Sequence, residues 1–149
     1  MLKDIKKIIK NNHGMSLIEI LISLTLMGIA GTFVAGKVYE NLQEGQVSSA
    51  KIQIKALADR LTEFRRDCHT LPTSEQGLDA LIEKPTGGAR ECKRYAPGGY
   101  IKDGKIPMDP WDGEYVYESD GKTFVIKSLG ADNAEGGEGA DADLNSKEF

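Results

Sequence analysis

The chain has few of the residues that build zinc sites or catalytic centres. Of its 149 residues, two are cysteines, Cys68 and Cys92, and two are histidines. His69 follows Cys68 directly, but no second pair of Cys or His residues has the spacing of zinc ligands. A nucleophile elbow, a phosphate-binding loop and a histidine-based pair are also lacking. The sequence therefore predicts a protein that is not an enzyme. For the two cysteines, a Cys/His zinc site or thiol catalysis is the sharper alternative to a disulfide.

Concentrated positive charge is missing as well. The chain has 19 Lys and Arg residues against 23 Asp and Glu residues, which gives a net charge of −4. Beyond residue 14 the positive side chains are scattered among negative ones and form no basic stripe. Because nucleic-acid binding depends on such a stripe, we expect no nucleic-acid partner.

Charged residues are nearly absent from residues 15–36, where Glu19 is the only one. A run of this length fits a membrane-spanning helix, since a hydrocarbon core about 30 Å thick takes roughly 20 helical residues. The run is too long for the core of a secretory signal, and its small residue, Gly14, precedes the apolar stretch. We predict that residues 15–36 cross a membrane once and remain on the mature protein.

Residues 1–14 form a basic leader. Four lysines and one aspartate give it a charge of +3, which leaves −7 on the remaining 135 residues. By the positive-inside rule the leader stays in the cytoplasm. Residues 37–149 are then predicted to form one domain on the other side of the inner membrane, in the periplasm.

The junction between the leader and the apolar run reads Gly14-Met15-Ser16-Leu17-Ile18-Glu19. It resembles the class III signal of type IV pilins and type II secretion pseudopilins, most of which have Phe where Met15 stands. The resemblance implies that a membrane prepilin peptidase cuts between Gly14 and Met15 and then N-methylates the Met15 amine. The plainer alternative is an ordinary N-terminal anchor with an accidental glutamate.

Glu19 is expected to act in assembly. A carboxylate within the membrane costs about 2.5 to 3.5 kcal/mol on insertion scales, so it is usually retained for a task. In a staggered filament the Met15 amine of one subunit can lie beside Glu19 of its neighbour. That pairing would offset the desolvation of the carboxylate only after assembly.

The apolar run continues into a polar stretch with helical periodicity. Ile54, Leu57, Leu61 and Phe64 recur at helical spacing, which predicts one helix from near Met15 to near Arg66. Pro72 and the residues before it are expected to end this helix. Thr73 and Gln76 then form a capping-box pattern, which predicts a short helix over residues 73–82.

Several short motifs later in the sequence resemble those of the major pseudopilins of type II secretion, both in their residues and in their order along the chain. They are Leu71-Pro72-Thr73-Ser74-Glu75-Gln76-Gly77-Leu78, Lys84-Pro85-Thr86, Gly98-Gly99-Tyr100-Ile101 and Asp109-Pro110-Trp111. The resemblance implies an α+β, type IV pilin-like fold with a long N-terminal helix packed on a small antiparallel sheet. It also implies a subunit that polymerises into a periplasmic filament driving secretion. The implied partners are further copies of the chain, minor pseudopilins and the inner-membrane assembly platform.

Two alternatives in function stay open. The first is a type IV pilin or competence pseudopilin, although surface pilins usually have a longer C-terminal domain and a C-terminal disulfide region. The second, from another class, is a membrane-anchored calcium-dependent enzyme, which is supported only by the acidic C-terminal stretch.

The two cysteines are expected to form a disulfide. Residues 37–149 are predicted to face the oxidising periplasm, where a single pair is usually bridged. The family's usual pattern lacks these cysteines, so the pairing of Cys68 with Cys92 follows from compartment and count alone. In the chain-entropy model, closing a loop of about 25 residues stabilises by roughly 3 kcal/mol.

Residues 114–118 and 123–127 are β-rich runs on either side of Ser119-Asp120-Gly121, a turn signal. We predict a hairpin whose apolar face packs on Ile54, Leu57 and Leu61. Trp111 is predicted to anchor the core or its edge.

The C-terminal residues 129–144 alternate acids with glycines. Composition alone predicts a solvated acidic tail. Short oxygen-bearing side chains between glycines can also fold around calcium, which takes six to eight oxygen ligands. Major pseudopilins bind calcium in this loop, and the resemblance carries over the Leu129 carbonyl and the carboxylates of Asp132, Asp141 and Asp143. The register of Asp141 against Asp143 stays open.

Overall fold

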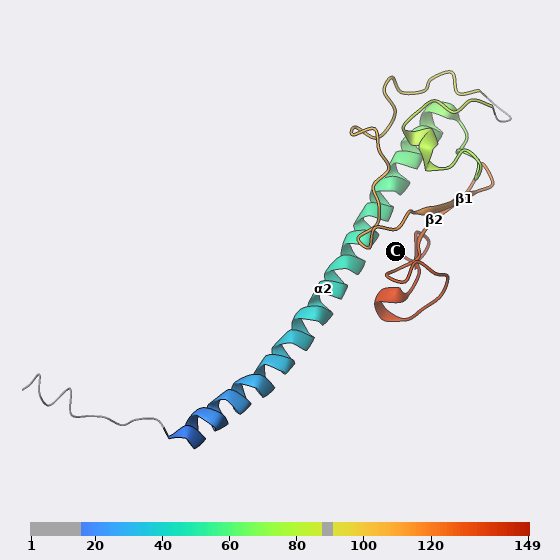
Figure 1. Cartoon of the computed structure of the whole chain (residues 1–149). Helices are drawn as coiled ribbons and strands as arrows, with labels where there is room; N and C mark the ends of the chain where they lie inside the picture. Colours follow the sequence, from blue (N-terminus) through green and yellow to red (C-terminus); the bar gives the residue numbers. More distant parts are fainter. Residues whose placement is uncertain (1–15, 88–90) are drawn as a thin grey trace, which may run out of the picture. The chain divides into compact units, whose positions relative to one another are not determined.

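The computed structural model describes residues 16–87 and 91–149, so Gly14 and Met15 lie outside the described residues. The chain divides into two compact units, Met1–Asn41 and Leu42–Phe149. Helices and strands lie in the order α2, η1, β1, β2, η2, β3. Figure 1 labels α2, β1 and β2. The predicted α+β class, with a long N-terminal helix and a small antiparallel sheet, is confirmed.

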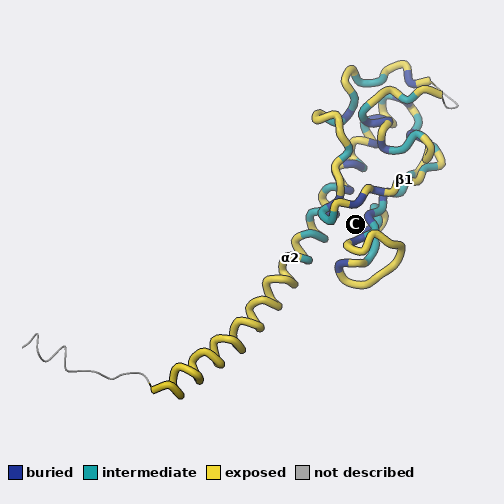
Figure 2. The backbone as a smooth tube through the Cα atoms, in the orientation of Figure 1, coloured by how far each residue is buried: buried dark blue, intermediate teal, exposed yellow. Residues whose placement is uncertain are grey.

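Helix α2, Leu17–Cys68, begins in the first unit and ends in the second. From Leu17 to Asn41 every residue is exposed, as the yellow part of the tube shows in Figure 2. This stretch contains large apolar side chains such as Leu24, Met27 and Phe33. By length and composition, α2 is apolar enough to cross a membrane.

In the second unit, α2 buries one stripe of side chains. The stripe recurs every three or four residues, the spacing that brings side chains to one face of a helix. Its members are Ala50, Ile54, Leu57, Leu61, Phe64 and Cys68. The apolar stripe expected from the sequence is therefore confirmed.

The helix ends two residues later than predicted. The His69 N–H still donates to the Arg65 carbonyl at 2.8 Å, but His69 itself has a φ of 60°. A left-handed residue at this position closes the last helical turn. Pro72 follows and prevents the helix from resuming.

The helix predicted over residues 73–82 is wrong as to type and length. Reciprocal capping-box hydrogen bonds do join Thr73 and Gln76, at 3.0 and 3.2 Å. They close a turn, and within residues 73–82, all of which the structure describes, the only helical segment is the 3-10 helix η1, Leu78–Leu81. The reason is Gly77, whose φ of 60° and ψ of −165° cannot continue an α-helix. Leu78 and Leu81 are nevertheless buried, as predicted.

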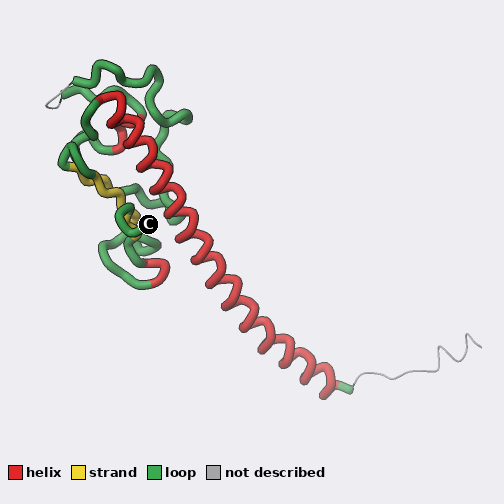
Figure 3. Tube along the Cα trace, turned by 180° about the vertical axis from the view of Figure 1, so that it is seen from behind, coloured by secondary structure: helices red, strands yellow, loops and turns green. Residues whose placement is uncertain are grey.

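The sheet has three antiparallel strands in the order β1, β2, β3. β1, Val116–Ser119, and β2, Phe124–Ser128, form the predicted hairpin, with Val116 opposite Lys127. Asp120 holds the turn by accepting hydrogen bonds from the Lys122 and Thr123 N–H groups. These bonds lower the pKa of the Asp120 carboxyl. β3, Leu144–Asn145, pairs with the end of β2 and was not predicted. Figure 3 shows the strands in yellow beside α2.

The hairpin packs on the buried stripe of α2, as expected. Tyr115, Tyr117 and Ile126 belong to the same buried cluster as Ile54, Leu57 and Leu61. The Tyr115 hydroxyl also donates to Gln53 Oε1 on α2 at 2.7 Å. Burial, and secondarily the nearby Asp109 carboxylate, raise the pKa of Tyr115, which therefore stays neutral. Trp111 is partly buried at the edge of this core, which confirms its predicted role as an anchor.

Candidate functional site

The N-terminal turn of α2 holds the predicted assembly residue. The Ile20 N–H donates to the Ser16 carbonyl at 3.1 Å, and this bond closes the first turn of the helix around Glu19. Glu19 lies in that first turn, where a negative side chain interacts favourably with the helix dipole. Its side chain is solvent-exposed in the single chain and is available to a neighbour.

The hydroxyl groups of the apolar stretch are satisfied within the helix. Ser23 Oγ donates to the Glu19 carbonyl at 2.8 Å, and Thr25 Oγ1 donates to the Leu21 carbonyl at 2.7 Å. Unsatisfied polar groups are costly in lipid, and back-bonding to the preceding turn removes that cost. Glu19 is the single charged side chain between Leu17 and Gly36, and it is exposed.

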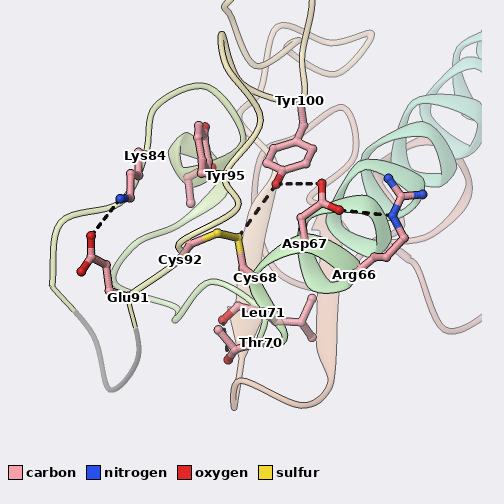
Figure 4. The surroundings of a disulfide bond; sticks show 11 residues. Arg66, Asp67, Cys68, Thr70, Leu71, Lys84, Glu91, Cys92, Tyr95 and Tyr100 are labelled. Carbon is pink, nitrogen blue, oxygen red and sulfur yellow. Dashed lines mark hydrogen bonds and ion pairs between the residues drawn. A yellow bond between two sulfur atoms is a disulfide. The ribbon is translucent and has the colours of Figure 1, made fainter.

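Cys68 and Cys92 form the predicted disulfide, with their Cα atoms 4.6 Å apart (Figure 4). Both residues are buried. Since the bond uses both thiols, the alternatives of a Cys/His zinc site and of thiol catalysis are overturned.

Aromatic side chains surround this disulfide. Phe64, Tyr95 and Tyr100 pack edge to face or tilted, with ring centroids 5.3 to 6.1 Å apart. The Tyr100 hydroxyl donates to Asp67 Oδ2 at 3.3 Å and lies near Cys68 Sγ, as Figure 4 shows. Burial raises the pKa of both tyrosines, so they stay neutral. The cluster is a packing centre that holds residues 92–100 against the end of α2.

The acidic loop, residues 129–144, is closed by its own backbone. The Ala131 N–H donates to the Ala140 carbonyl at 2.9 Å, and the Asp143 N–H donates to the Gly136 carbonyl at 3.1 Å. In return, the Gly136 N–H donates to Asp143 Oδ2 at 3.2 Å. The loop includes the 3-10 helix η2, Gly139–Asp141, and runs into β3. A freely solvated tail would make none of these bonds, so this stretch is a folded loop.

The predicted carboxylates take different places in this loop. Asp132 Oδ1 accepts a hydrogen bond from the Ala134 N–H at 3.1 Å, while Asp141 is exposed. Asp143 Oδ1 is buried without a hydrogen-bond partner. Within residues 16–87 and 91–149, no three His, Cys, Asp or Glu side chains gather as a metal site. The assignment of calcium to Asp132, Asp141 and Asp143 therefore stays a prediction.

The oxygen atoms of the loop nevertheless suit a hard cation. Gly130 and Gly137 approach the Asp141 backbone so closely that a Cβ on either would collide with its carbonyl group. This approach brings separate turns of the loop together at the Asp141 carbonyl. Backbone carbonyls and carboxylates are the ligands that calcium prefers, and the unpartnered Asp143 Oδ1 is one such oxygen.

The role of Asp109 was not predicted from the sequence, where this residue appeared only within the motif Asp109-Pro110-Trp111. Asp109 is 4% exposed. Its Oδ1 accepts hydrogen bonds from the Trp111 N–H at 3.0 Å and the Gly113 N–H at 2.7 Å. Its Oδ2 accepts one from the Ser128 hydroxyl at 2.5 Å. An aspartate that opens a Pro- and Gly-containing turn was the available signal, because such a side chain often bonds to the backbone that follows.

Comparisons with protein families agree with the sequence resemblance. Residues 37–147 match the family model described as type II secretion system (T2SS), protein G. Residues 9–35 match the prokaryotic N-terminal methylation motif. The second match spans the apolar start of α2 and the residues just before it.

Individual relatives cover nearly the whole chain. The type II secretion system core protein G of Vibrio cholerae is 37% identical over 140 residues, 93% of each chain. That of Pseudomonas aeruginosa is 38% identical over 137 residues, 91% of this chain and 94% of the relative. A crystal structure of the major pseudopilin from the type 2 secretion system of enterohaemorrhagic Escherichia coli superposes with a TM-score of 0.62. It is 31% identical, and the match covers 73% of this chain and 92% of that one.

Proposed function

Since this chain belongs to the type II secretion system protein G family and is a pseudopilin of type II secretion, we propose that it polymerises into the periplasmic filament that drives secretion. The observation that carries this proposal is the exposed apolar stretch of α2 with its single carboxylate, Glu19. In a filament, the apolar stretches of neighbouring subunits would cover one another. The subunit's role is structural, and we propose no catalytic activity for it.

The family match decides between two of the functions left open by the sequence. The alignments with core protein G relatives include the globular part of the chain as well as its N-terminal motif. This favours a function in type II secretion over one in a surface pilus or competence filament. The chain is membrane-anchored through the start of α2. We propose that residues 37–149 lie in the periplasm, and that minor pseudopilins and the inner-membrane assembly platform are its partners.

We propose that prepilin peptidase removes residues 1–14 and methylates the new N-terminus at Met15. The match of residues 9–35 to the N-terminal methylation motif supports this. Intact mass spectrometry of membrane-extracted protein is expected to give a chain that begins at methylated Met15. A chain that still begins at Met1, or one that has lost the apolar residues 15–36, would contradict the proposal.

Glu19→Ala provides the test of assembly. The variant is expected to be processed and inserted normally, yet to form few filaments and secrete poorly, because the Met15 amine of a neighbour loses its partner. Glu19→Asp is expected to be intermediate, since its carboxylate is withdrawn by one methylene. Electron microscopy of filaments and a secretion assay measure both effects.

Glu75→Ala is a matched control, because Glu75 is an exposed acid outside α2. It is expected to assemble like the unmodified protein. Abundant normal filaments from Glu19→Ala cells would show that this carboxylate does not determine assembly.

We further propose that the acidic loop binds calcium. The Leu129 carbonyl and the carboxylates of Asp132, Asp141 and Asp143 would hold the ion, with the register of Asp141 against Asp143 open. When bound, calcium would neutralise the acids and join the two ends of the loop. The closed backbone of the loop and the buried, unpartnered Asp143 Oδ1 support this proposal.

A further inference from the structure

The turn formed by residues 109–113 touches three parts of the second unit. Gln46 Nε2 on α2 donates to the Pro110 carbonyl at 3.2 Å. The Ser128 hydroxyl at the end of β2 donates to the Asp109 carboxylate. A Cβ on Gly113 would lie 3.3 Å from Asn133 Oδ1, which belongs to the acidic loop. The helix, the sheet and the acidic loop therefore all meet this turn.

Ser128 links Asp109 to the first residues of the acidic loop by hydrogen bonds. Its side chain is fully buried, and its Oγ accepts a hydrogen bond from the Gly130 N–H at 3.4 Å while donating to Asp109. Ser128 and Gly130 flank Leu129, so these two bonds hold the backbone on both sides of the Leu129 carbonyl. Gly130 also lies against the Asp141 backbone.

We propose that Asp109 is a positioning residue for the cation site of the acidic loop: through Ser128 it fixes the Leu129 carbonyl toward the ion. This inference rests on the proposed calcium binding. Asp109 is not among the proposed ligands. Its carboxylate accepts all three hydrogen bonds from groups that are fixed by the turn or by β2, so the acceptor cannot move independently of them. Residues that orient metal ligands in this way typically change metal affinity by about 10- to 100-fold when they are substituted.

The neighbouring glycine shows how little freedom the carboxylate has. A Cβ on Gly113 would lie 3.0 Å from Asp109 Oδ2 and 3.1 Å from Oδ1, closer than most Cβ contacts. The turn thus leaves space for the carboxylate and for Asn133, and for little else. The entry to the loop at Ser128 bonds to this carboxylate, and the loop residue Asn133 lies against the same glycine.

The test uses the mature protein in detergent micelles and calcium chloride as the probe. Calorimetric titration gives the dissociation constant for calcium, and melting in excess chelator gives the stability of the calcium-free state. Ser128→Ala and Asp109→Asn are each expected to raise the dissociation constant about 10- to 100-fold. If Asp109→Asn fails to fold, Ser128→Ala still tests the proposal, because it removes the same hydrogen bond.

Asp120→Asn is the matched control. Asp120 also accepts backbone hydrogen bonds in a turn, but its turn is at the far end of the hairpin from the acidic loop. It is expected to lower the melting temperature in chelator while leaving the dissociation constant within about twofold. If Asp109 had only a structural role, Asp109→Asn would likewise lower the melting temperature and leave the dissociation constant for calcium unchanged.

Three outcomes separate the hypotheses. Weaker calcium binding in Ser128→Ala, with Asp120→Asn unchanged, supports the positioning role. Calcium binding by Ser128→Ala and Asp109→Asn equal to that of the unmodified protein would overturn it while leaving calcium binding intact. An unmodified protein that binds no calcium would overturn the proposed metal site and this inference with it.

Discussion

At the scale of single residues, α2 offers a matched pair of isoleucines. Ile54 is completely buried, whereas Ile52, two residues earlier on the same helix, is 67% exposed. Ile54→Ala is expected to lower the free energy of unfolding by about 2 to 5 kcal/mol, because it leaves a cavity beneath the hairpin. Ile52→Ala is expected to change it by about 0.5 kcal/mol or less. Urea unfolding of the unassembled protein in micelles measures both, and equal losses would mean that the buried stripe is misassigned.

At the scale of a structural element, the acidic loop is expected to respond to calcium. Binding to the folded state alone stabilises by about 2.7 kcal/mol at a hundredfold excess over the dissociation constant. The melting temperature should therefore be higher in millimolar calcium than in chelator, and Asp132→Ala should lose most of this difference. Without the ion, the acids repel one another and the loop is expected to open.

Magnesium at the same concentration is the control for this prediction. It demands near-ideal octahedral geometry and sheds water reluctantly, so it is expected to stabilise the loop less than calcium does. If calcium leaves the melting temperature unchanged and Asp132→Ala behaves like the unmodified protein, the loop is an acidic surface feature without a metal.

At the scale of the whole molecule, the disulfide ties the end of α2 to residues that contain no helix or strand, 92–100. Cys92→Ser is expected to lower the free energy of unfolding by about 3 kcal/mol, the chain-entropy estimate for a loop of this size. Chemical denaturation of the oxidised protein measures the loss. The double variant Cys68→Ser/Cys92→Ser should lose no more than the single one, and a reducing agent should affect neither. Undiminished stability in Cys92→Ser would show that aromatic packing alone holds this segment.

Local and covalent features of the chain could be predicted from the amino-acid sequence. The apolar run around Glu19, the buried stripe through Ile54 and the hairpin turn at Asp120 each depend on residues close together in the chain. The disulfide could be predicted because two cysteines allow only one pairing. The family resemblance could be recognised because its motifs are short and each consists of residues adjacent in the chain.

The folded backbone conformation and contacts between separate segments decided the rest. Capping at Thr73 predicts a helix, but Gly77 adopts a conformation outside the α-helical region, and the segment becomes a turn and η1. β3 has two residues, too few for a periodic pattern, and it forms because β2 offers a free edge. Asp109 and Ser128 are 19 residues apart, and only the folded chain brings the hydroxyl to the carboxylate. A hydrogen bond of this kind leaves no local pattern, because its partners are selected by packing rather than by spacing.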